Sequence, residues 1–329
     1  MSTSHRVLVT GATGYIGRHL VQHLADNGWA VTASSRQAAA PDQSGAAIQW
    51  VQASPWQPAD GSPDAHALIP PIRALMETDT VVHLAGIAHQ TNGIPFEAYH
   101  RANMVASSVL GREAVQAGVR HFVFVSTIAV MGLPNNDQPL TPEMKPAPVS
   151  AYGQSKWAAE QALVNLMRNS GTRLTVIRPP LVYGPNPKGN LKQLIRLINS
   201  GLPMPWASVR NQRSMIGLSN LVHLLNHVCN LGNVEMPEPQ TLMPADVCWS
   251  TPDLIRIIAK AMKRPARLFS MPQPVLNLSV RLPVIGSRCD TLLSSLVQQD
   301  QHLKEQLGWT PPETPASEIA RMVDSVTVS

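Results

Sequence analysis

Two residues in one segment of the chain have side chains that could move a proton together. Tyr152 and Lys156 lie four residues apart in Tyr152-Gly153-Gln154-Ser155-Lys156, so a helix beginning near Ser150 would place both on one face. A free tyrosine titrates at about 10 and is a poor proton relay at neutral pH, but a nearby ammonium favours the phenolate. Ser126 and Thr127 follow an apolar run and could offer a hydroxyl to the same substrate oxygen. These groups together predict acid–base chemistry on an oxygen that gains or loses a proton.

A glycine-rich turn near the N-terminus predicts a dinucleotide site. It directly follows the apolar run 6–10 and opens a segment with helical spacing that stops at Gly28. Glycine lets the backbone turn sharply and approach a pyrophosphate, while the helix N-terminus supplies amides and the positive end of its dipole. The residues expected to bind the cofactor here are Gly11, Thr13, Gly14, Tyr15, Ile16 and Gly17.

The end of the second predicted strand bears on the choice of cofactor. Ser34-Ser35-Arg36 ends that strand, and Arg36 lies 19 residues after Gly17. An acidic residue there would bind the ribose hydroxyls of NAD, whereas an arginine can pair with the 2′-phosphate of NADP. The sequence therefore favours NADP(H), with NAD(H) still open, since Arg36 could also be a solvated residue that stacks on adenine.

These residues need a scaffold, and the pattern of the chain indicates which one. Short β-branched runs predict buried strands at 6–10, 30–34, 80–84, 121–125 and 174–177. Helical patterns between the later runs lie at about 104–117 and 151–169. Strands that alternate with helices predict right-handed βαβ units, and hence a Rossmann-type doubly wound parallel α/β sheet. The proline-rich segment 41–71 is expected to be mostly loop, with one broken strand at 48–51.

The texture of the sequence changes after about residue 180. Proline becomes frequent, strand-like runs become rare, and helices are expected at about 191–200, 218–231 and 252–263. We therefore predict a dinucleotide-binding Rossmann domain over 1–180. A smaller, mainly helical substrate lobe over 181–329 is expected to return in part to the Rossmann sheet.

The composition excludes several other classes of protein. The chain has 329 residues, of which 44% are hydrophobic and 14% charged, so it can bury a large core. Apolar runs fall short of the roughly 20 residues of a membrane span, and no signal peptide is evident, which predicts a cytoplasmic protein. A net charge of +5 without a basic run does not imply nucleic acid. The run 275–282 could lie on a membrane surface, but a helix that packs its leucines on the core is the favoured interpretation.

No metal site is predicted. Cys229, Cys248 and Cys289 match no common ligand spacing and are expected to be free thiols. His83 and His89 are too isolated to act as ligands, so a hydrogen-bonded role at a strand end is expected instead.

Taken together, these motifs resemble the extended short-chain dehydrogenases/reductases, specifically the nucleotide-sugar epimerase/dehydratase group that includes the UDP-galactose 4-epimerases. The resemblance covers essentially the whole chain. The matching segments are the Gly11/Gly14/Gly17 turn, Val82-His83-Leu84-Ala85-Gly86, Asn103, Ser126-Thr127, Tyr152/Lys156 and Arg178-Pro179-Pro180-Leu181-Val182-Tyr183-Gly184-Pro185.

The resemblance implies a role for each matching residue. Thr127 would bind the reacting oxygen of the sugar, Tyr152 would be the acid/base, and Lys156 would hold the nicotinamide ribose and tune Tyr152. Other implied cofactor-binding residues are Leu84, Ala85, Gly86, Asn103 and Pro179, beside Tyr152 and Lys156 themselves. The implied substrate-binding residues are Ser126, Thr127, Asn190, Leu191, Arg213 and Arg288, with Arg213 clamping the UDP diphosphate and a surface role equally open for Arg288.

Departures from the family pattern narrow the reaction. Ile128 and Ala129 follow Thr127 where sugar dehydratases carry two carboxylates, so elimination and decarboxylation are disfavoured. Gly217 and Asn220 stand where the family has His and Asp, and Ala53-Ser54 replaces an acidic dipeptide that contacts adenine. Hydride transfer at one carbon is what remains.

Two reactions at C4 of a UDP-sugar fit this pattern. The segments 83–89, 178–185 and 307–312 most resemble bacterial O-antigen enzymes that reduce UDP-4-keto-6-deoxy-N-acetylhexosamines, and Arg36 agrees through NADP. The 4-keto reductase is therefore the main prediction, and a UDP-hexose or UDP-N-acetylhexosamine 4-epimerase is the alternative. A reductase of a non-sugar ketone and a non-catalytic dinucleotide-binding protein are weaker alternatives. The resemblance also implies a homodimer that pairs the helices at 104–117 and 151–169.

Overall fold

The structure is a computed structural model that describes residues 5–36, 48–56, 64–88, 93–132, 138–231, 239–272 and 293–327. The chain divides into two compact units. The first comprises residues 1–133, 142–178 and 222–243, and the second comprises residues 134–141, 179–221 and 244–329.

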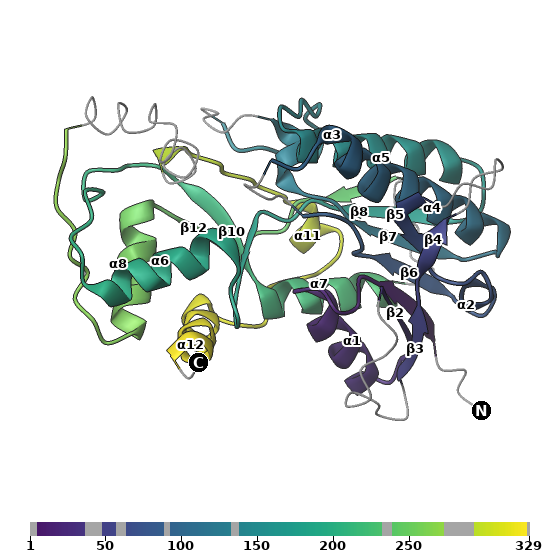
Figure 1. The fold of residues 1–329 in the computed structure, drawn as a ribbon, viewed down its shortest axis with the longest axis horizontal. Coiled ribbons are helices and arrows are strands. Elements are labelled where there is room, and N and C mark those ends of the chain that lie inside the picture. Colours follow the sequence, from purple (N-terminus) through teal and green to yellow (C-terminus); the bar gives the residue numbers. More distant parts are fainter. Residues whose placement is uncertain are drawn as a thin grey trace. The chain divides into compact units, whose positions relative to one another are not determined.

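A seven-stranded parallel sheet forms the centre of the first unit, in the order β11-β8-β7-β6-β1-β2-β3 (Figure 1). The strands are β1 (Arg6–Thr10), β2 (Ala30–Ser35), β3 (Ile48–Gln52), β6 (Thr80–His83), β7 (His121–Val125), β8 (Arg173–Ile177) and β11 (Gln240–Leu242). Both faces of its inner strands are buried, which explains why they read as β-branched runs rather than as alternating patterns. The predicted doubly wound parallel sheet is confirmed.

Helices cover both faces of this sheet (Figure 1). On one face, α1 (Gly17–Asp26) meets α7 (Leu218–Asn230), where the rings of His23 and His223 lie 6.3 Å apart. On the other face, α4 (Ala106–Gln116) packs against α5 (Ala151–Met167). The apolar cluster beneath them includes Leu8, Leu110, Phe122, Phe124, Ala159 and Leu163.

Two segments of the first unit differ from the sequence-based expectation. The loop expected within 41–71 contains an antiparallel pair, β4 (Ser54–Trp56) and β5 (Asp64–Ile69), so that expectation is wrong there. Pro55 is tolerated because β4 pairs on one side only. The helix expected from 104 begins earlier, since α3 (Phe96–Tyr99) and a π-helix (His100–Val105) run directly into α4. A short α2 (Arg73–Met76) precedes β6.

The second unit contains a three-stranded sheet, β12-β10-β9, with helices packed around a core of its own. Its strands are β9 (Leu181–Tyr183), β10 (Arg213–Gly217) and β12 (Val247–Trp249). Its helices are α6 (Gly189–Ser200), α8 (Thr251–Ala261), α11 (His302–Glu305) and α12 (Pro315–Thr327). These strands are short and irregular in pattern, which is why the sequence shows mainly the helices.

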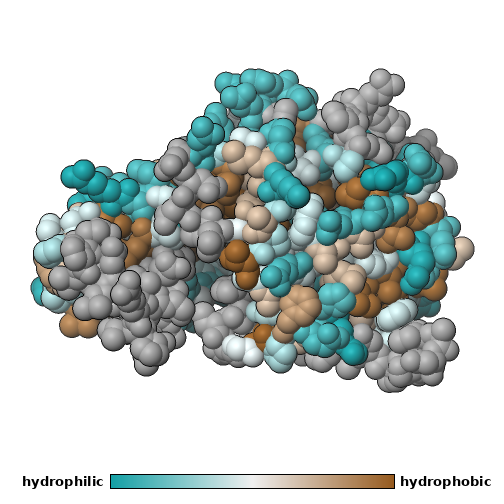
Figure 2. Space-filling model, turned by 90° about the horizontal axis from the view of Figure 1, so that it is seen from above, coloured by the Kyte–Doolittle hydropathy of each residue, from teal (hydrophilic) through white to brown (hydrophobic). Residues whose placement is uncertain are grey.

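Hydrophobic residues are interspersed with hydrophilic ones on the face of the molecule shown in Figure 2. The large exposed apolar side chains include Phe96 and Val149 in the first unit and Leu202 and Phe269 in the second. Within the described parts of the chain, no helix combines the length and the apolar character needed to cross a membrane.

Candidate active site

The first part of the site is the glycine-rich turn, at the point where the strand order reverses between β1 and β6. Gly11 has a φ of +69°, and a Cβ atom on it would lie 2.8 Å from the amide nitrogen of Ala85. Only glycine therefore lets the loops after β1 and β6 pass so closely. Helix α1 follows, and the aliphatic side chain of Ile16 before it cannot cap its amides. A glycine turn of this kind at a strand switch point suits a dinucleotide pyrophosphate, so the residues present fit a dinucleotide cofactor.

Asn103 fastens the loop after β6 to helix α5. It is fully buried in the π-helix, and its Oδ1 accepts a 2.8 Å hydrogen bond from the amide of Ile87. Its Nδ2 donates to the carbonyl of Ile87 at 3.1 Å and to Oγ of Ser155 at 3.0 Å. Gly86, at a φ of +152°, leaves room for this amide, since a Cβ there would lie 2.5 Å from Oδ1.

Two of the three predicted reaction groups, Thr127 and Tyr152, come together where β7 ends, and Lys156 lies one turn after Tyr152 on α5. Thr127 caps the short helix 128–131, and its Oγ1 accepts a 3.2 Å hydrogen bond from the amide of Ala129. Ser150 caps α5 as expected, and a Cβ on Gly153 would lie only 2.6 Å from the carbonyl oxygen of Ala129. This close approach presses the start of α5 against the turn after Thr127, and the side chains of Thr127 and Tyr152 are hydrogen-bonded.

Burial moves the two titratable groups of this site in opposite directions. It raises the pKa of Tyr152 to about 12, a change that the hydrogen bond with Thr127 opposes and the nearby Tyr99 reinforces. It lowers the pKa of Lys156 to about 7, against the effect of the Glu160 carboxylate. At neutral pH, Tyr152 therefore keeps its proton unless a neighbouring charge lowers its pKa, and Lys156 exchanges readily between its charged and neutral forms.

The buried ion pair between Glu160 and Arg178 was not predicted from the sequence. Nη2 of Arg178 lies 2.7 Å from Oε2 of Glu160, and Nε lies 3.2 Å from both carboxylate oxygens. Ser126 donates its hydroxyl to the same carboxylate, so this side chain faces Glu160. The spacing of the residues could have indicated Glu160, because it lies four residues after Lys156 and therefore on the same face of the helix.

His83 has the hydrogen-bonded role expected of it. The ring is buried at the end of β6, with Nδ1 2.6 Å from Oγ1 of Thr10 and Nε2 2.9 Å from Oγ of Ser107. His89 lies outside the described residues. No group of three or more His, Cys, Asp and Glu side chains suited to a metal ion occurs in the described ranges of the chain.

Arg36, the residue expected to distinguish NADP from NAD, is exposed just beyond β2, where its carbonyl accepts a 3.3 Å hydrogen bond from Nε2 of Gln52. In the second unit, Asn190 is exposed in the first turn of α6, whereas Leu191 packs its side chain into the core and can act only through its backbone. Nη1 of Arg213 donates to the carbonyl and the hydroxyl of Ser294, at 3.1 and 2.9 Å. Arg288, Cys289 and the run 275–282 lie outside the described residues.

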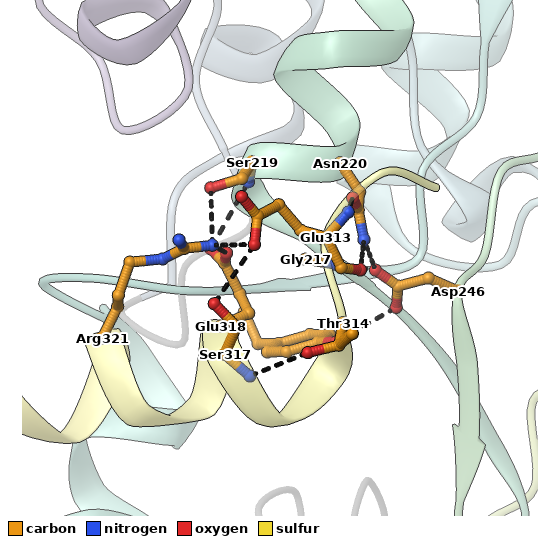
Figure 3. Close-up of polar contacts among 10 residues, drawn as sticks. Gly217, Ser219, Asn220, Asp246, Glu313, Thr314, Ser317, Glu318 and Arg321 are labelled. Carbon is orange, nitrogen blue, oxygen red and sulfur yellow. Dashed lines mark hydrogen bonds and ion pairs between the residues drawn. The ribbon is translucent and has the colours of Figure 1, made fainter. Parts of the chain in front are cut away.

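The two departures at Gly217 and Asn220 belong to a polar cluster in the second unit (Figure 3). Asp246 accepts hydrogen bonds from Nδ2 of Asn220 at 2.6 Å, the amide of Gly217 at 2.7 Å and the hydroxyl of Tyr183 at 3.2 Å. On α12, Nη2 of Arg321 bonds the buried carboxylate of Glu318 at 2.5 Å. We call this group the Asp246 cluster. It comprises Tyr183, Gly217, Ser219, Asn220, Asp246, Glu313, Thr314, Ser317, Glu318 and Arg321.

Comparisons with known proteins agree with this geometry. Residues 7–233 match the NAD dependent epimerase/dehydratase family. A UDP-glucose 4-epimerase of Vibrio cholerae is 30% identical over 316 residues, which cover 94% of this chain and 91% of that protein. A ceramide reductase of Caulobacter vibrioides is 25% identical over 322 residues, which cover 97% and 90%. The structure of MoeE5 in complex with UDP-glucuronic acid and NAD superposes with a TM-score of 0.74 at 24% identity, covering 98% of this chain and 99% of that one. The chain therefore belongs to the NAD dependent epimerase/dehydratase family and is an enzyme of the short-chain dehydrogenase/reductase type.

Proposed function

We propose that this enzyme is a UDP-sugar 4-epimerase, which inverts the configuration at C4 of a UDP-hexose or UDP-N-acetylhexosamine. The observation that carries the proposal is the hydrogen bond between Thr127, just after β7, and Tyr152 on α5, with Lys156 one turn further along the same helix. The Vibrio cholerae relative, named as a UDP-glucose 4-epimerase, supports this reaction over the 4-keto reductase that the sequence favours. Ile128 and Ala129 also lack the carboxylates that elimination would need.

The reaction assigns one task to each of the three side chains. Tyr152 accepts the proton of the C4 hydroxyl during oxidation. It returns the proton after the keto sugar has rotated to present its other face for reduction. Thr127 donates a hydrogen bond to that oxygen. Lys156, in its protonated form, stabilises the phenolate of Tyr152. Because burial raises the pKa of Tyr152, such a neighbouring positive charge is required. The bound dinucleotide supplies a hydride acceptor and a hydride donor in turn.

The two ligands are assigned to different sets of residues. The first unit holds the dinucleotide on the glycine turn, the loop 84–86 and Asn103. Pro179, Asn190 and Arg213 belong to the second unit, where Asn190 and Arg213 are assigned to the sugar nucleotide. The homodimer through the helices at 104–117 and 151–169 remains a prediction.

A 4-keto reductase is the second candidate, and Arg36 is the observation that favours it. Arg36 is exposed beyond β2, where its guanidinium could bind the 2′-phosphate of NADP. Oxidised cofactor bound there could also be replaced by NADPH from solution. Reductive chemistry also occurs in the family, as the name of the ceramide reductase relative shows for that protein. Replacing Arg36 by Asp should raise the KM for NADPH more than the KM for NADH, and an unchanged ratio would reject the 2′-phosphate argument.

The deciding experiment offers both substrates to the purified enzyme. In one arm, UDP-glucose and UDP-N-acetylglucosamine are incubated with NAD, and proton NMR follows inversion at C4. In the other, NADPH and a UDP-4-keto-6-deoxy-N-acetylhexosamine are mixed, and nicotinamide absorbance is followed. Inversion without net cofactor consumption is expected. Stoichiometric NADPH oxidation without inversion would establish the reductase, and neither reaction, with dinucleotide binding intact, would overturn both.

A further inference from the structure

The ammonium of Lys156 lies over an aromatic ring. Its Nζ is 4.0 Å from the centroid of Phe124, a fully buried residue of β7 that lies three positions before Thr127. The face of a phenyl ring carries partial negative charge, and its attraction for a cation increases when water is excluded. Lys156 is itself almost completely buried. The contact therefore meets the conditions under which a cation–π interaction is strongest.

The other neighbour of this ring is an imidazole that is held neutral. His83 is the cross-strand partner of Phe124, and the two rings stack with centroids 5.7 Å apart and an interplanar angle of 24°. Ser107 donates its hydroxyl to the carbonyl of Asn103, so its oxygen accepts the proton on Nε2 of His83. Thr10 accepts from the amide of Ala85 and donates to Nδ1.

Because both ring nitrogens are engaged in this way, His83 can gain no proton without losing the bond from Thr10. Burial also favours the neutral imidazole, because it lowers the pKa of His83 to about 3. The imidazole therefore adds no positive charge beside Lys156, although it lies close enough to interact with the ammonium electrostatically.

In the described part of the chain, Glu160 supplies the negative charge that acts on Lys156. The titratable groups that act on it are Glu160 on α5 and His83 on β6. Tyr152 lies one turn before it on α5, with Tyr99 beside that tyrosine, and Arg178 binds Glu160. Glu160 is the carboxylate among them, and it already accepts hydrogen bonds from Arg178 and Ser126. The ring of Phe124 is thus an uncharged group in direct contact with the ammonium, and its face can stabilise that charge.

We propose that Phe124 is a positioning residue, whose ring face holds the Lys156 ammonium on the face of α5 that it shares with Tyr152. This assignment rests on the role of Lys156 in the proposed function. The phenyl ring keeps the lysine charged in a site that otherwise favours its neutral form, so that a positive charge is present when Tyr152 must become a phenolate.

The test compares two phenylalanines of the same strand. Phe122 lies two residues before Phe124 on the same face of the sheet, is equally buried, and also contacts His83, at 6.0 Å. No cation–π contact of Phe122 occurs in the described part of the chain. Phe122→Leu therefore matches Phe124→Leu in lost volume and in lost contact with His83, but it leaves the ring beneath Lys156 in place.

The readout is the titration of Lys156 in protein labelled with ¹³C at lysine Cε, with Lys156→Met used to assign the resonance. For Phe124→Leu, we expect a midpoint about one pH unit lower, which corresponds to about tenfold less ammonium at a given pH above it. For Phe122→Leu, the midpoint should stay near that of the parent protein. An equal shift in both variants, or no shift in either, would overturn the proposal.

A second series tests the ring without changing its shape, in case Phe124→Leu does not fold. Site-specific incorporation of mono-, tri- and pentafluorophenylalanine at position 124 withdraws charge from the ring face in steps. The Lys156 midpoint should fall in the same order, and a midpoint that ignores fluorination would refute the assignment. This titration needs no turnover, so a failure of the proposed epimerase reaction would appear in the substrate assays and leave this result unaffected.

Discussion

The two units each contain a buried glutamate that is paired with an arginine, and the pairs differ in what surrounds them. Glu160 and Arg178 are both buried, with side chains 2% and 5% exposed, and they join α5 to the chain after β8. Glu318 is completely buried, but Arg321 is 40% exposed and lies one turn away on the same helix. Water can therefore replace part of the second interaction but not the first. The difference identifies Glu160–Arg178 as the pair on which the local structure depends more strongly.

The tyrosines of the two regions differ in a similar way. Tyr152 is hydrogen-bonded to the hydroxyl of Thr127 and has a lysine on the next turn, so groups that can exchange a proton lie near its hydroxyl. Tyr183 donates to Asp246, and burial together with that carboxylate raises its pKa far above the ordinary value. The Asp246 cluster holds its backbone in place, whereas the cluster around Tyr152 can also exchange protons.

The largest expected effect separates these two tyrosines by activity. Tyr152→Phe should lower kcat by about 100- to 10,000-fold, because it removes the acid/base group, while cofactor binding persists. Tyr183→Phe is the matched control, and it should cost about 1 kcal/mol of stability with turnover largely intact. Steady-state kinetics and thermal unfolding of both variants provide the measurement. If Tyr152→Phe kept its activity, Tyr152 would lose its assigned role.

The next effect separates the two arginines by stability. Arg178→Met leaves the Glu160 carboxylate buried without its partner and should lower the free energy of unfolding by about 3–5 kcal/mol. Arg321→Met should cost only about 1 kcal/mol, because the arginine is 40% exposed and water can take its place beside Glu318. Urea denaturation of the two variants compares them directly. Equal losses would show that burial of the arginine does not decide the cost.

The same contrast explains how much could be predicted from the sequence. The glycine turn, Thr127, Tyr152 and Lys156 are local motifs on strands and helices of clear period, so both the sheet and these groups could be predicted. Glu160 was missed because a glutamate in a helix is usually a surface residue, and only the tertiary packing of Arg178 reveals its burial. The strands β4, β5, β9, β10, β11 and β12 were missed. Four of them, β4, β9, β11 and β12, have only three residues each, and long-range pairing rather than periodicity specifies all six.

Asn220 provides a smaller test inside the Asp246 cluster. Asn220→Asp would place two carboxylates where an amide now donates at 2.6 Å, so it should cost about 2 kcal/mol through lost bonding and repulsion. Asp246→Asn in the same chain should recover part of that loss, because it restores a donor opposite a carboxylate. A double-mutant cycle by urea denaturation measures this coupling. If the two losses simply added, the hydrogen bond between these side chains would carry no coupling energy.

The last expected effect is a pH dependence of stability that has opposite signs in the two units. His121, at the start of β7, is buried against Thr175 and Arg173, and its pKa is lowered to about 3. Between that value and its ordinary value of about 6.5, the unfolded chain binds the extra proton, so stability falls as the pH falls. Asp246 has its pKa raised by burial, so the folded state holds the extra proton and its contribution falls as the pH rises.

Variants at these two positions should therefore change the slope of stability against pH in opposite senses. His121→Asn should flatten the rise in stability between about pH 4 and 6.5, by at most about 1.4 kcal/mol per pH unit. Asp246→Asn should steepen it, since it removes the term of opposite sign. Urea denaturation across this range measures both slopes, and each variant serves as the control for the other. Parallel curves for the parent protein and His121→Asn would mean that water reaches His121 in the folded state, since only a hydrated imidazole keeps the same pKa folded and unfolded.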